Sequence, residues 1–176
     1  MDATAIRFGK AMHSALRDSF YGIDPMDSYR DIWHEYYGCK GWDEFLLTGM
    51  EFIGEFKKLW DGMGLTPVFT ETRLSVQEHI VQPDFVAITK DGGYVVGDFK
   101  FTETPVIADD VYRQMVMGAY TVAENINNNE PVDVVVFNFV KSTKVVNIIR
   151  WTVTKSDIEN LMAKRNEINI DGLLTV

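Results

Sequence analysis

The chain has 176 residues, a length that suits one domain with a hydrophobic core and is too short for two domains of ordinary size. Its formal net charge of −9 argues against a protein held to nucleic acid by its overall field, although a local basic rim or a metal ion can invert the potential at one site. No apolar run approaches the roughly 18 residues of a membrane span, and the single cysteine, Cys39, excludes an intramolecular disulfide and predicts a reducing, cytoplasmic setting.

The first expected helix covers residues 4–20, where apolar side chains recur at helical spacing. His13 lies on that apolar face together with Ile6 and Gly9. A histidine in such a place is more often a satisfied core residue than a metal ligand. Gly9, one turn before His13, would permit close packing of a neighbouring element.

Two further helices are expected before the strands begin. The pair Asp24–Pro25 resembles an N-cap followed by proline at the first helical position, and it predicts a short helix that ends near Gly38. A longer helix is expected at residues 43–61, with its first residue as the N-cap and Gly62 as the stop. Residues 1–62 would therefore form a helical N-terminal part of the domain.

The pattern then changes to that of a sheet. Residues 67–76 are rich in β-branched side chains and predict a strand, and the apolar runs 85–88 and 94–96 flank turn residues and predict a β-hairpin. A buried strand is expected at 132–140 because that run is almost continuously apolar. The other expected elements are a helix at 109–127 that begins at Asp109, a strand at 144–153, and a C-terminal helix at 156–168 that begins with the capping box Ser156 to Glu159.

This order of elements predicts an α/β fold, with a mixed central sheet of about five strands flanked by helices. The sheet, including the helix between its strands, would occupy residues 66–153. Residues 1–176 would form a single domain, because the sequence contains no repeat, low-complexity tract or linker.

The hairpin places charged residues where they are energetically unfavourable. A register that pairs Ile88 with Tyr94 brings Asp84 opposite Asp98, and Lys100 leaves the strand on the same face as Asp98. Like charges directly opposite each other destabilise a sheet, and two carboxylates a few ångströms apart repel by several kcal/mol at a protein-like dielectric. Protonation, solvent exposure or a divalent cation would relieve this repulsion, and clustered oxygen ligands suit Mg²⁺ or Mn²⁺.

A simpler interpretation is also open. Asp84 could lie in a turn at the start of a strand, with Asp98 and Lys100 on an exposed edge. Gly97, directly before Asp98, favours a functional site, because glycine within a strand marks a bulge or a close approach.

The charged residues also stand in a recognisable order. Pro83 and Asp84, followed fourteen residues later by Asp98, Phe99 and Lys100, resemble the PD-(D/E)XK nuclease signature. More narrowly, the chain is similar to the RecB-type branch of that superfamily, which includes phage-encoded exonucleases.

Three further positions contribute to the resemblance. Gly9, followed four residues later by His13, resembles the N-terminal helix motif of the branch. Glu71 stands where the branch commonly has a glutamate on its first core strand, and Gln114 resembles its glutamine motif. One position departs from the pattern: the tyrosine expected four residues after the glutamine is replaced by Gly118, and Tyr120, six residues on, lies on a different helix face.

The resemblance implies a metal-dependent DNA nuclease, an exonuclease in preference to an endonuclease, that hydrolyses phosphodiester bonds with metal-activated water. It implies one or two Mg²⁺ or Mn²⁺ ions, a DNA substrate, an intracellular and phage- or prophage-encoded origin with no membrane association, and a recombination, single-strand annealing or helicase protein as partner. The implied catalytic residues are Asp84, Asp98, Lys100, Gln114 and Glu71; the implied metal ligands are His13, Asp84, Asp98, the Phe99 backbone carbonyl and Glu71.

Two interpretations compete with this one. A non-catalytic module on the same fold that binds nucleic acid or protein would agree with the acidic net charge. An α/β domain with an acidic surface hairpin would predict that Asp84→Asn raises stability and changes no activity.

Overall fold

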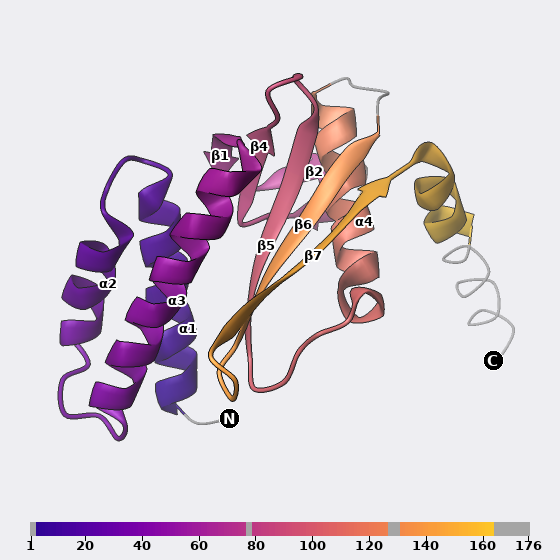
Figure 1. The fold of residues 1–176 in the computed structure, drawn as a ribbon. Helices are drawn as coiled ribbons and strands as arrows, with labels where there is room; N and C mark the ends of the chain where they lie inside the picture. The colour runs from indigo at the N-terminus through magenta and orange to yellow at the C-terminus, as the bar shows by residue number, and fades with distance from the viewer. Residues whose placement is uncertain (1–2, 77–78, 127–130, 164–176) are drawn as a thin grey trace, which may run out of the picture.

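The computed structural model describes residues 3–76, 79–126 and 131–163, which form a β-sheet between two helical layers (Figure 1). A last helix at 155–163 follows the sheet. The elements before it are α1 (Ala3–Ser19), α2 (Pro25–His34), α3 (Trp42–Met63), β1 (Thr66–Thr70), β2 (Leu74–Val76), β3 (His79–Val81), β4 (Phe85–Ile88), β5 (Tyr94–Thr102), α4 (Ala108–Asn125), β6 (Val132–Val140) and β7 (Val145–Val153).

The central sheet has five strands in the order β1-β4-β5-β6-β7, and only β5 and β6 run parallel. β2 and β3 form a separate two-stranded sheet. The expected α/β fold with a mixed sheet of five strands is therefore confirmed. The hairpin register is confirmed as well, since Ile88 pairs with Tyr94 and Val86 pairs with Val96.

Each face of the sheet has its own hydrophobic core. Figure 1 shows α1, α2 and α3 together on one side of the sheet and α4 on the other. The three-helix side packs on aromatic residues such as Phe85 and Phe99, whereas α4 packs on valines such as Val86 and Val96. Because side chains alternate along a strand, Asp98 leaves β5 on the face opposite to Phe99, towards α4. The two cores fix which face of β5 carries the charged residues.

Gly97 is required by packing between the strands that carry the candidate site. A β-carbon at this position would lie 1.8 Å from Cζ of Phe85. The Phe85 ring therefore lies across the backbone directly before Asp98, which confirms the close approach expected at this glycine.

The first helix forms as expected, but its buried face differs from the prediction. Ile6 is 44% exposed, and the buried side chains include those of Phe8, Met12 and Leu16. A β-carbon at Gly9 would have no neighbour within 4 Å, so the expected close packing at this glycine was wrong. The face is rotated because the partners of α1 are α2 and the aromatic sheet face, which the helical period alone does not identify.

The next two helices differ from the prediction at their ends. Asp24 caps α2 through a 2.7 Å bond from the Met26 amide to Oδ1, as expected, but the helix ends at His34 instead of near Gly38. α3 ends at Met63, and the glycines that flank it, the N-cap Gly41 and the C-cap Gly64, both have a left-handed backbone. The stop expected at Gly62 was therefore two residues early, because Gly62 has helical neighbours on both sides.

The strand predicted at 67–76 is two strands in two different sheets. β1 ends at Thr70, and Glu71 has a φ of 45°, which turns the chain out of the central sheet. β2 and β3 then pack against α4, where Nδ2 of Asn125 donates a hydrogen bond to the Ser75 carbonyl oxygen at 3.0 Å.

The last two helices begin earlier than predicted. The Asp110 carboxylate accepts the Ile107 amide at 3.0 Å, and α4 begins at Ala108, so Asp109 is not its N-cap. In the C-terminal helix, Oδ2 of Asp157 accepts the Thr154 amide at 2.8 Å and the Thr154 hydroxyl accepts the Asp157 amide at 3.3 Å. These two residues are the capping box, and the one predicted two residues later was wrong. Residues 127 and 164–168 of the predicted helices lie outside the described residues.

No helix in the described parts of the chain has both the length and the apolar character needed to cross a membrane.

Candidate active site

Five of the predicted site residues meet beside the middle of β5, where its pairing with β4 ends. Asp98 and Lys100 lie on β5, and Asp84 directly precedes β4. His13 reaches Asp84 from α1, and Gln114 reaches Asp98 from α4. Two helices that are remote in sequence, α1 and α4, therefore converge on the hairpin.

Asp98, Lys100 and Gln114 form a closed set of contacts. Nε2 of Gln114 donates to Oδ1 of Asp98 at 2.9 Å, and Nζ of Lys100 donates to Oε1 of Gln114 at 3.0 Å. Nζ of Lys100 also lies 2.8 Å from Oδ2 of Asp98. That contact is an ion pair without hydrogen-bond geometry, and the buried Oδ2 atom accepts no hydrogen bond. A buried carboxylate oxygen in this state retains the capacity to accept a further donor or a cation.

Asp84 is held by the backbone of the neighbouring strand. Its Oδ2 atom accepts the Phe99 amide at 2.6 Å, and its Oδ1 atom lies 3.4 Å from Nδ1 of His13. The β4–β5 pairing begins only at Phe85, so the Asp84 carboxylate contacts β5 where the ladder has ended. This contact keeps Asp84 beside Asp98 despite their like charges.

The electrostatics of the cluster favour bound protons. Burial raises the pKa of Asp98, the nearby Asp84 carboxylate raises it further, and Lys100 offsets these effects only in part. Burial alone would lower the pKa of His13, but its contact with Asp84, together with the nearby Asp98 and Glu71 carboxylates, outweighs burial and the net shift is upward. Cations that neutralise these carboxylates would therefore compete with protons for the same site.

Glu71 lies at the margin of the cluster. Its amide donates to the Asp84 carbonyl oxygen at 3.1 Å, but its Oε2 atom forms an ion pair with Nη1 of Arg17 at 3.1 Å. The structure therefore places the Glu71 backbone at the site and directs its carboxylate to Arg17. The prediction that Glu71 lies on the first core strand was wrong, since β1 ends one residue earlier.

Two residues that sequence reasoning missed support the site. Arg17 lies four residues after His13 and so on the same side of α1, which was the available signal. Asn138 is fully buried on β6; its Nδ2 atom donates to the Lys100 carbonyl oxygen at 3.3 Å, and its Oδ1 atom accepts the Val106 amide at 2.9 Å. A polar residue within an apolar strand needs such partners, and this requirement could have identified it.

The donor set matches the chemistry of a divalent cation, although the side chains are not arranged around one. Asp84, Asp98 and His13 supply two mutually repelling carboxylates and an imidazole, and Oδ2 of Asp98 is buried without a hydrogen bond. Among the described residues, however, no three His, Cys, Asp or Glu side chains are grouped closely enough to hold a metal ion. The Asp98 carboxylate forms an ion pair with Lys100, and the Glu71 carboxylate forms one with Arg17. A metal ion could bind these carboxylates only if the ion pairs loosened.

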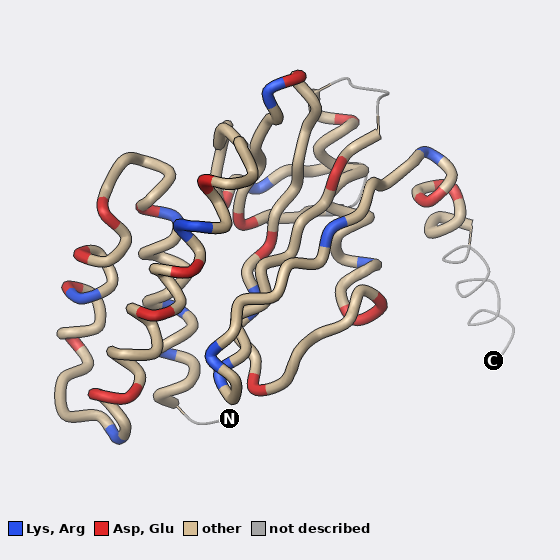
Figure 2. The backbone as a smooth tube through the Cα atoms, in the orientation of Figure 1, with Lys and Arg blue, Asp and Glu red and all other residues tan. Residues whose placement is uncertain are grey.

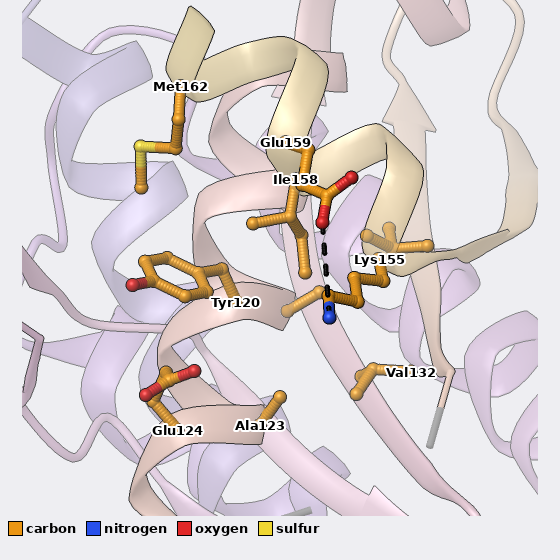
Figure 3. A pocket seen from close by; sticks show the side chains of 10 residues that line it. Tyr120, Ala123, Glu124, Val132, Lys155, Ile158, Glu159 and Met162 are labelled. Carbon is orange, nitrogen blue, oxygen red and sulfur yellow. Dashed lines mark ion pairs between the residues drawn. The ribbon is translucent and has the colours of Figure 1, made fainter. Parts of the chain in front are cut away.

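Tyr120 belongs to a different part of α4. It lines a pocket between α4 and the C-terminal helix, where its ring faces Ile158 and Met162 (Figure 3). Asp98 and Gln114 are not among the residues that line that pocket. Tyr120 therefore does not replace the tyrosine that the glutamine motif lacks.

Lysine and arginine residues are spread along the described parts of the chain. Figure 2 shows lysine and arginine positions dispersed among acidic ones along the described chain. Four lysines elsewhere on the described chain each have a carboxylate partner. These pairs are Lys57 with Asp24, Lys58 with Glu55, Lys141 with Glu103 and Lys144 with Glu51.

Comparison with solved structures identifies similar folds. The crystal structure of a candidate exonuclease from Eubacterium rectale matches 99% of this chain and 67% of its own chain, with a TM-score of 0.60 and 16% sequence identity. At that identity the likeness shows the fold alone. A second structure, of SSO0001, covers 93% of this chain and 74% of its own, at 11% identity and a TM-score of 0.35 that is too low to support an argument. No family model and no curated protein matches the sequence.

Proposed function

We propose that the protein is a metal-dependent nuclease that hydrolyses phosphodiester bonds in DNA. The observation that carries the proposal is the contact set at the end of the hairpin, where Gln114 bridges the buried Asp98 and Lys100 while Asp84 lies alongside. Nothing in the packing of the sheet requires two carboxylates and an ammonium group at this place. Buried charges kept at an energetic cost are more often found at functional sites than elsewhere.

The residues divide into two chemical roles. Asp84, Asp98 and His13 would hold a Mg²⁺ or Mn²⁺ ion, and Glu71 and the Phe99 carbonyl are further proposed ligands. When bound, the ion would lower the pKa of a water molecule and neutralise charge on the scissile phosphate. The Lys100 ammonium would orient the attacking water and offset the negative charge that develops in the transition state.

Gln114 would position the other groups. Its amide holds the Asp98 carboxylate through one atom and the Lys100 ammonium through the other, so both groups keep a fixed separation. The positioned water would attack in line and leave a 5′-phosphate and a 3′-hydroxyl, as expected for a PD-(D/E)XK nuclease. Because both the nitrogen and the oxygen of the Gln114 amide are hydrogen-bonded, Asp98 and Lys100 would move less relative to each other. Holding reacting groups in a fixed orientation is a recognised source of rate enhancement.

DNA as the substrate and action from an end are the finer parts of the proposal. They are supported by the resemblance to RecB-type nucleases and by the fold shared with the candidate exonuclease from Eubacterium rectale. The protein has a net charge of −9, and lysines such as Lys144 are paired with carboxylates. The bound divalent cation would therefore be the main group that attracts the DNA phosphate.

The decisive experiment is digestion of linear and closed circular DNA with Mn²⁺, Mg²⁺ or EDTA. Asp98→Ala and Lys100→Ala should each abolish the metal-dependent activity, whereas Lys144→Ala, which removes a surface lysine paired with Glu51, should retain it. Degradation of linear but not circular DNA would support an exonuclease. Full activity in either site variant would overturn the assignment of these residues.

A non-catalytic binding module on the same fold is the second candidate. It is favoured by the absence, among the described residues, of three metal-ligating side chains grouped for an ion. Calorimetry with Mn²⁺ separates the two functions, because a binding module would show no heat of binding at millimolar metal.

A further inference from the structure

A pocket lies beside the candidate active site, on the α4 face of β5. Asp98 and Gln114 line one part of it, so it is continuous with the proposed reaction centre. The β3 strand and the segment after it form the opposite wall, which includes Ile80. The pocket has a volume of about 210 Å³.

The pocket depends on the absence of a side chain at Gly118. This residue lies four positions after Gln114, so both occupy the same face of α4. A β-carbon at Gly118 would lie 3.3 Å from Cγ1 of Val96, a tight contact that points into the space between helix and sheet. A larger residue would fill the space beside Gln114, which is where the glutamine motif otherwise has its tyrosine.

The walls of the pocket are mainly apolar apart from Gln82 and the groups at the site. Val96 and Met115 contribute buried apolar surface, and Ile80 lines the pocket although the residue is 72% exposed. Ligand pockets commonly combine apolar walls with a few polar groups that fix orientation. The volume lies below the roughly 300–1,000 Å³ of pockets that take drug-sized ligands, so it suits a single planar ring system.

We propose that this pocket receives the base of a nucleotide next to the scissile phosphate. This inference rests on the proposed nuclease function and names the substrate state that the site would select. A base can enter only when it is unpaired and unstacked, so the preferred substrate is single-stranded DNA or a frayed duplex end. Apolar side chains contact the flat face of a base, which all four bases have. The pocket would therefore contribute affinity without sequence specificity.

The β2–β3 hairpin that carries Ile80 is attached to α4 at one end, and at the other end it continues through Pro83 into Asp84. Asn125 on α4 donates a hydrogen bond to the Ser75 carbonyl oxygen of β2, which pairs with β3. The distance between Ile80 and α4 is therefore set in part by this hydrogen bond, which involves neither Asp84 nor His13. Changes in the pocket should alter how the substrate is held without removing the groups that hold the ion.

The test is single-turnover cleavage of end-labelled single-stranded oligonucleotides that each contain one abasic residue at a different position. With wild-type protein and Mg²⁺, an abasic residue at one position relative to the cleaved bond should slow cleavage about ten-fold, as expected when one base no longer buries its surface against apolar side chains. Abasic residues elsewhere should have little effect. Gly118→Leu should cleave more slowly than wild type and lose the dependence on position.

A second variant avoids the tight contact at Val96. Ile80→Ala removes apolar surface from an exposed wall residue and should reduce the abasic effect several-fold. The matched control, Val68→Ala, changes an apolar residue that is 49% exposed on β1 and should leave the effect unchanged.

The outcomes separate the two proposals. Cleavage that is indifferent to every abasic position, or an abasic effect that survives in both Gly118→Leu and Ile80→Ala, overturns the pocket assignment and leaves the nuclease standing. Failure of wild-type protein to cleave any oligonucleotide or DNA overturns both.

Discussion

The Gln114 amide donates a hydrogen bond to Asp98 at 2.9 Å and thereby connects the middle of α4 to the centre of β5. The same side chain accepts a hydrogen bond from Lys100. Gln114 therefore fixes the relative position of the two charges that the proposed chemistry needs.

Replacement of Gln114 by alanine should lower kcat/KM for DNA cleavage about 100-fold, because Asp98 and Lys100 lose their common partner and a small displacement of reacting groups costs about that much. The melting temperature should fall only modestly, because Gln114 is itself exposed although the buried Asp98 loses a hydrogen-bond donor. A control on the same helix is Glu124→Gln, an exposed residue that lines the other pocket. Activity equal to wild type in Gln114→Ala would contradict the positioning role.

The charge of Asp98 should make stability depend on pH in an unusual direction. Its pKa in the folded protein is raised above 3.8, chiefly by burial and then by Asp84. The folded state therefore binds the proton more tightly than the unfolded state does, and this stabilisation is present below pH 3.8 and lost as the pH rises through the folded pKa. Without divalent ions, Asp98→Asn should raise the melting temperature at neutral pH and remove this contribution.

Asp133 provides a control of opposite sign. Burial would raise its pKa, but contacts with Arg150 and Thr152 outweigh burial and lower it. Its stabilisation is present above pH 3.8 and is lost as the pH falls through the folded pKa. Asp133→Asn should therefore lower the melting temperature at neutral pH. Calorimetric scans with EDTA measure both variants, and two shifts of the same sign would contradict the account of Asp98.

His13 should couple ion binding to proton release. Its pKa is raised above 6.5 because the Asp84 carboxylate, with Asp98 and Glu71, outweighs the effect of burial, yet the imidazole must be neutral to bind a metal. The affinity for Mn²⁺ should rise with pH by up to about ten-fold per pH unit below that pKa, as expected for release of one proton. Titration calorimetry at several pH values should show this slope in wild type and in His34→Ala, and a shallower slope in His13→Ala.

Sequence reasoning located the hairpin and its charges because both depend on local patterns. Turn residues between two apolar runs fix the register from Ile88 and Tyr94 onward, and alternation along the strand then determines which side chains share a face with Asp98. The order of the helices and strands follows from similar short-range patterns. These features needed no knowledge of residues that are remote in the chain.

The features that sequence reasoning missed depend on contacts between remote residues. The pair formed by Arg17 and Glu71 joins positions 54 residues apart, and the break in the strand at Glu71 belongs to the same arrangement. The capping box at Thr154 was misplaced because two candidate boxes overlap, and the end of β7 at Val153 decides between them. Neither the break in the strand at Glu71 nor the position of the capping box can be predicted from local propensity.

Glu71 should be a residue at which function and stability oppose each other. Its φ of 45° is unfavourable for a side chain other than glycine, a strain of order 1–3 kcal/mol that is found at functional sites. Its ion pair with Arg17 is about one-third exposed and contributes only about 0–1 kcal/mol. Glu71→Gly should therefore maintain or raise the melting temperature while it weakens Mn²⁺ binding several-fold.

Lys144 is the matched control, because it also has a positive φ, of 54°, and also forms an ion pair, with Glu51. Lys144→Gly should maintain or raise the melting temperature in the same way and leave Mn²⁺ affinity unchanged. Glu71→Gln separates strain from charge, since it keeps the side chain in the strained conformation and removes the carboxylate. Weaker Mn²⁺ binding in both Glu71 variants would support a role of the carboxylate as a ligand, whereas wild-type affinity in both would exclude Glu71 from the metal site.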